Sequence, residues 1–288
     1  MRDDFAVFIL THGRADNVKT YKTLKKQGYT GKIYIVIDDE DSQEDIYYKN
    51  YGEEVYKFNK QKYIDTTDVM CGEEFRKVVV YARNACWDIA KDLGLNYFCV
   101  LDDDYTAFTH RYEEDDKLKV YRFQNLDAVF DAFLEFLDAT NSITVCMAQA
   151  GDLIGGKDGS KFKQKILRKA MNVWFMRTDR PFKFMGRINE DTNMYVTYGQ
   201  RGALMFTVVD AVVVQMQTQA QKGGLTDVYL NDGTYEKSFF SVMSAPSCVK
   251  VALMGNSPQR MHHLVDWEHC VPEILNECYK KRSEMNGE

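Results

Sequence analysis

The pair of acidic residues Asp102 and Asp104 is the feature of this sequence with the clearest chemical potential. The pair follows directly after the apolar run from Tyr97 to Leu101. Side chains two positions apart on an extended backbone face the same way, so these carboxylates act together while Asp103 points elsewhere. Mg²⁺ and Mn²⁺ prefer oxygen ligands and complete their shells with water and substrate phosphates. The spacing therefore indicates a metal site that neutralises the charge growing on a leaving phosphate group.

Two further polar clusters stand where other apolar runs end. Phe5 to Leu10 is followed by Thr11-His12-Gly13-Arg14, and Ile33 to Ile37 is followed by Asp38-Asp39. Continuous apolar runs of this length are typical of strands that are buried on both faces of a parallel sheet. Ligands collect outside the carboxyl ends of such strands. We therefore expect the three clusters to converge on one binding site.

The first half of the chain alternates such strands with amphipathic helices. Gly94 ends the longest predicted helix, and the glycines within 151–159 mark a loop. Beyond this loop, strand patterns outnumber helical ones. The change near residue 150 predicts two subdomains within one α/β domain. The expected strands are 5–10, 33–37, 55–58, 97–101, 143–147, 172–176, 203–209 and 248–254, and the expected helices lie near 18–24, within 73–93, at 126–137 and from 271 onward.

Composition limits the class of protein. The 288 residues, 45% of them hydrophobic and 28% charged, suit one large globular domain. The opening MRDDF lacks the basic and apolar regions of a signal peptide, and no apolar run reaches the roughly eighteen residues of a membrane span. The seven cysteines are odd in number and mostly in apolar surroundings, which favours reduced thiols in a cytoplasmic protein over a disulfide framework or a zinc ribbon.

Five segments between residues 5 and 200 resemble those of GT-A glycosyltransferases when they are taken as a set. They are FILTHGRADN, IDDED, YARN, YFCVLDDDY and GRINEDTNMY. The chain is most similar to the TET-associated glycosyltransferases of phages, which glycosylate hydroxymethylated pyrimidines in DNA and are akin in function to the base J glucosyltransferase. The resemblance implies a Rossmann-like, mostly parallel central sheet with helices on both faces. It also implies that residues 1–150 form the nucleotide-sugar-binding half, and that residues 151–288 form the acceptor-binding half with a C-terminal tail.

The resemblance further implies a UDP-sugar donor that carries a hexose or N-acetylhexosamine, with Mn²⁺ or Mg²⁺ as the metal cofactor. Asp102 and Asp104 would hold this metal, and GT-A enzymes often add a histidine from near the C-terminus. His262 or His263 is the expected histidine, with His269 as the second choice. The expected contacts to the UDP-sugar are Thr11, Arg14, Asp38, Asp39, Arg83, Asn84, Asp102 and Asp103.

The acidic pair Glu190-Asp191 matches, through the same resemblance, the position of the catalytic base in inverting GT-A enzymes. Asp191 would remove the proton of the acceptor hydroxyl, and Glu190 would be the alternate base or orient the acceptor. An acidic pair at a helix N-terminus is also a routine capping arrangement. The pair therefore has a structural explanation beside the catalytic one.

A basic segment interrupts an otherwise acidic chain, whose formal net charge is -6. DNA phosphates would meet such a segment, with the target base turned out of the duplex into a pocket. Nearby aromatic residues would stack on that base, unless they lie in the core as strand aromatics usually do. A loop that closes over the donor explains the segment equally well. The basic residues are Lys157, Lys161, Lys163, Lys165, Arg168 and Lys169, and the aromatic residues are Trp174, Phe175, Phe182 and Phe184.

Three other functions compete with DNA glycosylation. A GT-A enzyme with a glycan, lipid or protein acceptor would share the whole donor site. A nucleotidyltransferase would also combine a nucleotide-binding sheet with metal-binding carboxylates, but the single Gly13 is a poor match to its glycine-rich loop. A non-catalytic nucleic-acid-binding module would explain the basic segment and leave Asp102, Asp104 and Asp191 without a role.

Overall fold

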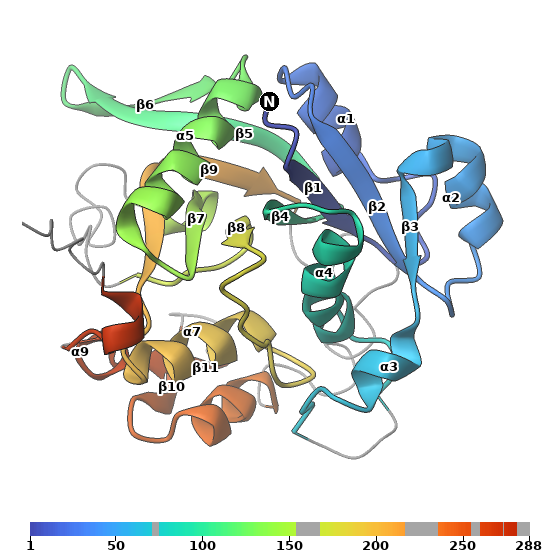
Figure 1. Ribbon diagram of the computed structural model, residues 1–288. Coiled ribbons are helices and arrows are strands. Elements are labelled where there is room, and N and C mark those ends of the chain that lie inside the picture. The colour runs from blue at the N-terminus through green and yellow to red at the C-terminus, as the bar shows by residue number, and fades with distance from the viewer. Residues whose placement is uncertain (71–74, 154–167, 217–235, 255–259, 273, 281–288) are drawn as a thin grey trace, which may run out of the picture.

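A nine-stranded mixed sheet forms the centre of the molecule, in the strand order β3-β2-β1-β4-β8-β7-β9-β5-β6 (Figure 1). The computed structural model describes residues 1–70, 75–153, 168–216, 236–254, 260–272 and 274–280. The strand pairings make β8 and β5 run opposite to the other seven strands. The predicted α/β class with a mostly parallel sheet is therefore confirmed. The strands are β1 (Phe5–Leu10), β2 (Lys32–Asp38), β3 (Val55–Phe58), β4 (Tyr97–Asp102), β5 (Tyr105–Glu114), β6 (Lys117–Arg122), β7 (Thr144–Gln149), β8 (Trp174–Arg177) and β9 (Met205–Gln215).

Both faces of the sheet are covered, and strand β1 shows why its sequence is apolar throughout. Phe5 and Val7 belong to one buried cluster, and Ala6 and Phe8 belong to the other. Period-two alternation sends successive side chains to opposite faces, so a strand covered on both faces has no polar position. The first cluster is covered by α1 (Lys19–Lys26), α2 (Glu44–Tyr51) and α5 (Leu126–Thr140), and the second by α3 (Lys60–Ile64), α4 (Val80–Asp92) and α7 (Glu190–Gln200).

The C-terminal elements gather below the sheet in Figure 1. Strands β10 (Val249–Met254) and β11 (Arg260–Val265) form a separate antiparallel pair. A helical stretch at 236–244 and the short helix α9 (Trp267–Cys270) accompany them. No helix among the described residues is long and apolar enough to cross a membrane. The cysteines that the structure describes are free thiols, and all of them except Cys278 are buried.

Two sequence-based predictions about elements are corrected, and one hairpin is found that the sequence did not predict. The hairpin β5–β6 was not predicted between Asp104 and the helix at 126–137; its turn places Asp115 and Asp116 in the left-handed region, which acidic side chains tolerate. The helix expected within 73–93 begins only at Val80. The terminal helix expected from 271 onward is wrong for the residues described there, which hold only the 3-10 turn Glu277–Tyr279.

Candidate active site

The carboxyl ends of β1, β2 and β4 lie side by side. Leu10 is paired with Val36 on one side and with Asp102 on the other, and the Thr11 amide donates a hydrogen bond to the Val36 carbonyl. The polar clusters that follow the three strands therefore meet at one edge of the sheet, as predicted from the parallel arrangement.

Asp103 turns away from its two acidic neighbours and anchors the loop after β1. Its carboxylate accepts hydrogen bonds from Thr11 Oγ1 at 2.7 Å and from Arg14 Nη1 at 2.8 Å. Burial raises the pKa of Asp103, and the nearby Arg14 opposes that rise. Asp102 is the last residue of β4, and Asp103 and Asp104 lie in the turn before β5, so the extended backbone that was expected to place Asp102 and Asp104 on one face ends at Asp102. The donor contacts expected of Thr11, Arg14 and Asp103 stay predictions.

A second network fixes the strand end of β2. Asp38 lies 2.7 Å from the buried Lys60 Nζ and 2.8 Å from His12 Nδ1. Burial raises the pKa of Asp38, but the hydrogen bonds from His12 and Lys60 outweigh it and lower the pKa to about 2. Asp39 is exposed and accepts a hydrogen bond from the Lys60 amide at 2.9 Å. Asp38 is thus the internal partner of Lys60, while Asp39 faces solvent beside the same edge.

Asp102 and Asp104 form a concentration of negative charge at the end of β4. Asp102 Oδ1 accepts a hydrogen bond from Arg83 Nη2 at 3.2 Å, and its Oδ2 lies 3.4 Å from the Tyr105 hydroxyl. Burial and the neighbouring Asp102 and Asp103 raise the pKa of Asp104 to about 7. A bound cation would relieve this repulsion, and Mg²⁺ or Mn²⁺ needs only one or two carboxylates when substrate phosphates and water fill the other positions. The residues therefore fit a divalent metal that is shared with a diphosphate.

Replacing Asp104 by asparagine tests this account of the charge cluster. The raised pKa of Asp104 means that its protonated form favours folding, and this contribution is lost as pH rises from its ordinary value of 3.8 through about 7. We expect Asp104→Asn to raise the free energy of unfolding of the metal-free protein by on the order of 2 kcal/mol near pH 9, and by less than about 0.5 kcal/mol near pH 3, below the ordinary pKa. Chemical denaturation at the two pH values measures both. Equal effects at both pH values would contradict the charge account.

Arg83 connects the end of β4 to the start of helix α7. It is buried, with 4% of its surface exposed, and its Nε donates a hydrogen bond to Glu190 Oε1 at 2.9 Å. Burial raises the pKa of Glu190 to about 6, although Arg83 opposes the rise. The expected base Asp191 is only partly buried, and its Oδ1 accepts a hydrogen bond from the Thr192 amide at 2.6 Å. The structure thus joins Glu190, one member of the predicted acidic pair, to Asp102 through one guanidinium.

Asn84 has a different neighbourhood from Arg83. Its side-chain amide donates hydrogen bonds to Thr67 Oγ1 at 3.1 Å and to the Phe184 carbonyl at 3.0 Å, and its Oδ1 accepts from the Phe184 amide at 2.9 Å. These bonds tie α4 to the chain that precedes α7. The UDP-sugar contact expected of Asn84 stays a prediction.

Of the C-terminal histidines, His263 lies beside the residue that precedes helix α7. His263 Nδ1 lies 3.1 Å from Asn189 Nδ2, and burial lowers the pKa of His263 to about 4. His262 Nδ1 lies 2.7 Å from the His263 carbonyl, and His269 pairs with Asp266 on the surface. Within the described ranges, no three or more His, Cys, Asp or Glu side chains gather to hold a metal ion. A histidine ligand for the metal therefore stays a prediction from resemblance alone.

The acceptor-side predictions have mixed outcomes. Lys157, Lys161, Lys163 and Lys165 lie outside the described residues, and Arg168 and Lys169 are the members of the basic segment that the structure places. Lys169 Nζ donates a hydrogen bond to Gln149 Oε1 at 2.5 Å, at the carboxyl end of β7. The nearby aromatic residues, for which base stacking and core packing were the two alternatives, are all buried in the core. These four residues are Trp174, Phe175, Phe182 and Phe184.

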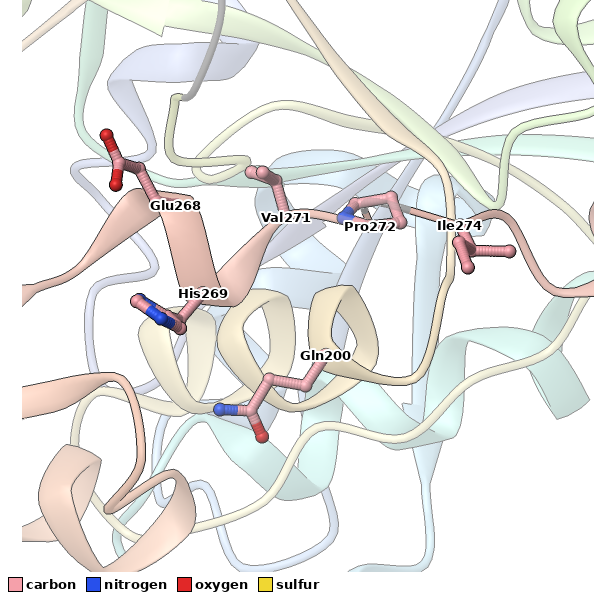
Figure 2. A pocket seen from close by; sticks show the side chains of 6 residues that line it. All are labelled: Gln200, Glu268, His269, Val271, Pro272 and Ile274. Atoms are coloured by element: carbon pink, nitrogen blue, oxygen red, sulfur yellow. The ribbon is translucent and has the colours of Figure 1, made fainter.

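A cavity of about 340 Å³ lies elsewhere, between the end of α7 and α9 (Figure 2). Gln200 projects toward it from the last position of α7, and Glu268, His269 and Ile274 are among the other lining residues. The full length of α7 separates it from Glu190. It is therefore not the site that the carboxylates form.

A mixed α/β sheet with charged side chains converging at its carboxyl edge is the architecture of nucleotide-binding enzymes. The chain matches the model of the TET-Associated Glycosyltransferase family over residues 5–224. This match covers most of the chain, and the protein belongs to that glycosyltransferase family. No curated protein matches the chain.

Three solved structures share similarity with the chain at low sequence identity. The mannosyltransferase PcManGT from Pyrobaculum calidifontis, in complex with GDP-Man and Mn²⁺, has 12% identity and a TM-score of 0.48, with 78% of this chain and 59% of that chain covered. S. aureus TarS 1-349 has 12% identity and a TM-score of 0.43, with coverages of 83% and 64%. A mycobacterial protein has 10% identity and a TM-score of 0.45, with coverages of 91% and 83%. The chain thus spans less than two thirds of the first two structures.

Proposed function

We propose that this protein transfers a sugar from a UDP-sugar to the hydroxyl of a hydroxymethylated pyrimidine in DNA, with a divalent metal and with inversion. Family membership supports the reaction class. The observation that carries the proposal is that Arg83 joins Asp102, the neighbour of Asp104 in the charge cluster, to Glu190, the neighbour of Asp191 in sequence. Metal-side and acceptor-side carboxylates that face one site are what a metal-assisted displacement requires.

Each part of the site has a role in this reaction. Asp102 and Asp104 would hold Mn²⁺ or Mg²⁺, which supplies neutralising charge to the leaving diphosphate when it is bound. Asp191 accepts the proton of the acceptor hydroxyl as the hydroxyl oxygen bonds to the anomeric carbon. The bond between that carbon and the diphosphate oxygen breaks, and UDP leaves with the electron pair. The products are UDP and a glycosylated base.

The donor is proposed to lie along the ends of β1 and β2. Thr11, Arg14, Asp38 and Asp39 border this edge, where parallel sheets bind nucleotides. Residues 1–150 then form the nucleotide-sugar half and residues 151–288 the acceptor half of one domain. The basic segment from Lys157 to Lys169 belongs to the acceptor half by sequence, and its charge suits DNA phosphates.

Charge reversal in the basic segment tests the DNA acceptor. We expect replacement of Lys161, Lys163 and Lys165 by glutamate to weaken binding to duplex DNA and to reduce the slope of log affinity against log salt by about 1 for each phosphate that the protein no longer neutralises. Hydrolysis of the UDP-sugar in the absence of DNA should stay unchanged, because the donor site lies on other elements. Fluorescence anisotropy at several salt concentrations measures the slope. Unaltered DNA affinity in the triple variant would remove the support that this segment gives to a DNA acceptor.

A direct assay separates DNA from the other acceptors. The protein is incubated with Mn²⁺ and a panel of UDP-sugars, and each reaction contains DNA with 5-hydroxymethylcytosine, the same DNA with plain cytosine, or glycan and peptide acceptors. Mass analysis of the nucleosides should show one added sugar on the hydroxymethylated base alone. Sugar transfer to glycan or peptide but never to DNA would decide for a glycosyltransferase with a different acceptor.

A further inference from the structure

Arg83 is a buried arginine whose guanidinium lies against two aromatic rings. It projects from the first turn of α4, and its guanidinium lies 4.3 Å from the ring centre of Trp174 on β8 and 5.7 Å from that of Phe184. Only 4% of the residue is exposed. A charge enclosed by aromatic walls is costly unless counter-charges accompany it. The acidic partners of Arg83 are therefore part of the reason why it can stay buried.

These partners come from two distant parts of the chain. Nη2 donates to Asp102 Oδ1, and Nε donates to Glu190 Oε1, which is 107 positions away in sequence. The third nitrogen, Nη1, is buried without a hydrogen-bond partner within the described residues. Buried polar groups are normally hydrogen-bonded, so this donor has the capacity to bind one further acceptor.

The bonds from Arg83 to Asp102 and Glu190, called the Arg83 bridge below, hold one carboxylate of the acidic pair, Glu190, and leave the other, Asp191, accessible. Glu190 is buried, with 5% of its surface exposed, and one of its oxygens is held by Arg83. Asp191 is partly exposed, and its carboxylate accepts a hydrogen bond from the Thr192 amide. A base must reach the acceptor hydroxyl, which the exposed member can do. The sequence leaves open which of the two carboxylates is the base, and the difference in exposure favours Asp191.

We propose that Arg83 is a positioning residue that fixes the metal-side carboxylate of Asp102 and the start of α7 relative to one another. Glu190 serves as its buried counter-charge, and Asp191 is carried in the correct place as the base. This inference rests on the proposed function, because it assigns the roles of Asp102 and Asp191. The Arg83 bridge spans the site, so its loss should misplace the reacting groups more than it weakens substrate binding.

The test compares Arg83→Lys with Glu190→Gln. A lysine retains the charge but cannot reach both carboxylates in a fixed fork. We expect Arg83→Lys to lower kcat by about 100-fold, as a misplacement of about 1 Å does, while KM for the UDP-sugar changes by less than about threefold. Glu190→Gln keeps an oxygen acceptor for Arg83 Nε, so its kcat should stay within about tenfold of the wild type. A kcat for Arg83→Lys equal to that of the wild type would overturn the proposal.

Metal binding gives a readout that needs neither DNA nor turnover. Loss of the free Mn²⁺ signal in electron paramagnetic resonance should show affinity about tenfold weaker in Arg83→Met, because Asp102 loses the partner that orients it. Arg177→Met is the matched control. Arg177, on strand β8, also pairs with two acids, Asp138 and Asp179, and its guanidinium lies over the ring of Tyr97 on β4. Arg177→Met should bind Mn²⁺ like the wild type. Wild-type Mn²⁺ affinity in Arg83→Met would contradict the positioning role.

Folding effects are separated by a double variant. Arg83→Met alone leaves Glu190 buried without its counter-charge, whereas Arg83→Met with Glu190→Met removes both charges. The double variant should regain the thermal stability of the wild type without regaining kcat. Recovery of both would show that Arg83 serves stability alone. If no transfer to DNA is found, hydrolysis of the UDP-sugar and Mn²⁺ binding still test Arg83, so the two proposals fail by different results.

Discussion

Asp191→Asn is expected to lower kcat for sugar transfer by about 1000-fold, within the range that general base catalysis supplies. An asparagine keeps the shape of the side chain but cannot accept the proton of the acceptor hydroxyl. Binding of UDP and Mn²⁺ should be retained, because Asp102 and Asp104 lie at the end of β4 and not on α7. Single-turnover kinetics with saturating acceptor measure the chemical step, and isothermal titration measures UDP binding.

Glu190→Gln is the matched control for Asp191→Asn, since the two residues are neighbours at the start of the same helix. Both variants remove one carboxylate and keep the size of the side chain. If Glu190→Gln loses about 1000-fold in kcat and Asp191→Asn does not, the base is Glu190 and the exposure argument for Asp191 is wrong. The wild-type rate in both variants would exclude this pair as the base.

The double replacement of Asp102 and Asp104 by asparagine should abolish metal-dependent transfer, with a loss of at least about 1000-fold in kcat/KM. Charge on the leaving diphosphate would then lack its neutralising ion. Excess Mn²⁺ should not restore the rate, and UDP should bind equally with and without the metal. Retained activation by Mn²⁺ in this variant would place the metal elsewhere.

Asp103→Asn is the control for the double replacement of Asp102 and Asp104. Asp103 is buried and holds Thr11 and Arg14, so its replacement should lower the free energy of unfolding by about 1–3 kcal/mol, the cost of weakened buried hydrogen bonds. Mn²⁺ affinity should stay near that of the wild type. The three consecutive aspartates would thus separate into two that serve the metal and one that serves the fold.

The strand pattern was predictable because continuous apolar runs in a sheet covered on both faces leave a strong signal. The extended backbone expected through Asp104 ends at Asp102, because Asp103 and Asp104 form the turn into β5. The hairpin β5–β6 was not predicted, because its strands are half exposed and their polar residues resemble those of a loop. The apolar pattern that identifies a strand in the sequence is weak at the edge of a sheet, because fewer of its side chains are buried there.

The contacts that shape the site depend on distant parts of the chain. The sequence did not single out Lys60, which follows a short strand, yet Lys60 is the buried partner of Asp38. Its place at the carboxyl end of β3, beside the clusters of β1 and β2, is the signal that would have found it. The bond from Arg83 to Glu190 joins residues on α4 and α7 that are 107 positions apart in sequence, and local spacing does not encode their proximity.

The most direct test of the proposed metal site at Asp102 and Asp104 is a crystal structure of the protein with UDP and Mn²⁺. We predict that the ion is bound by Asp102, Asp104 or both and is bridged to diphosphate oxygens, with the nucleoside along the ends of β1 and β2. A metal held by other residues, or UDP in the cavity between α7 and α9, would contradict the assignment of these carboxylates as the metal-holding centre of the enzyme.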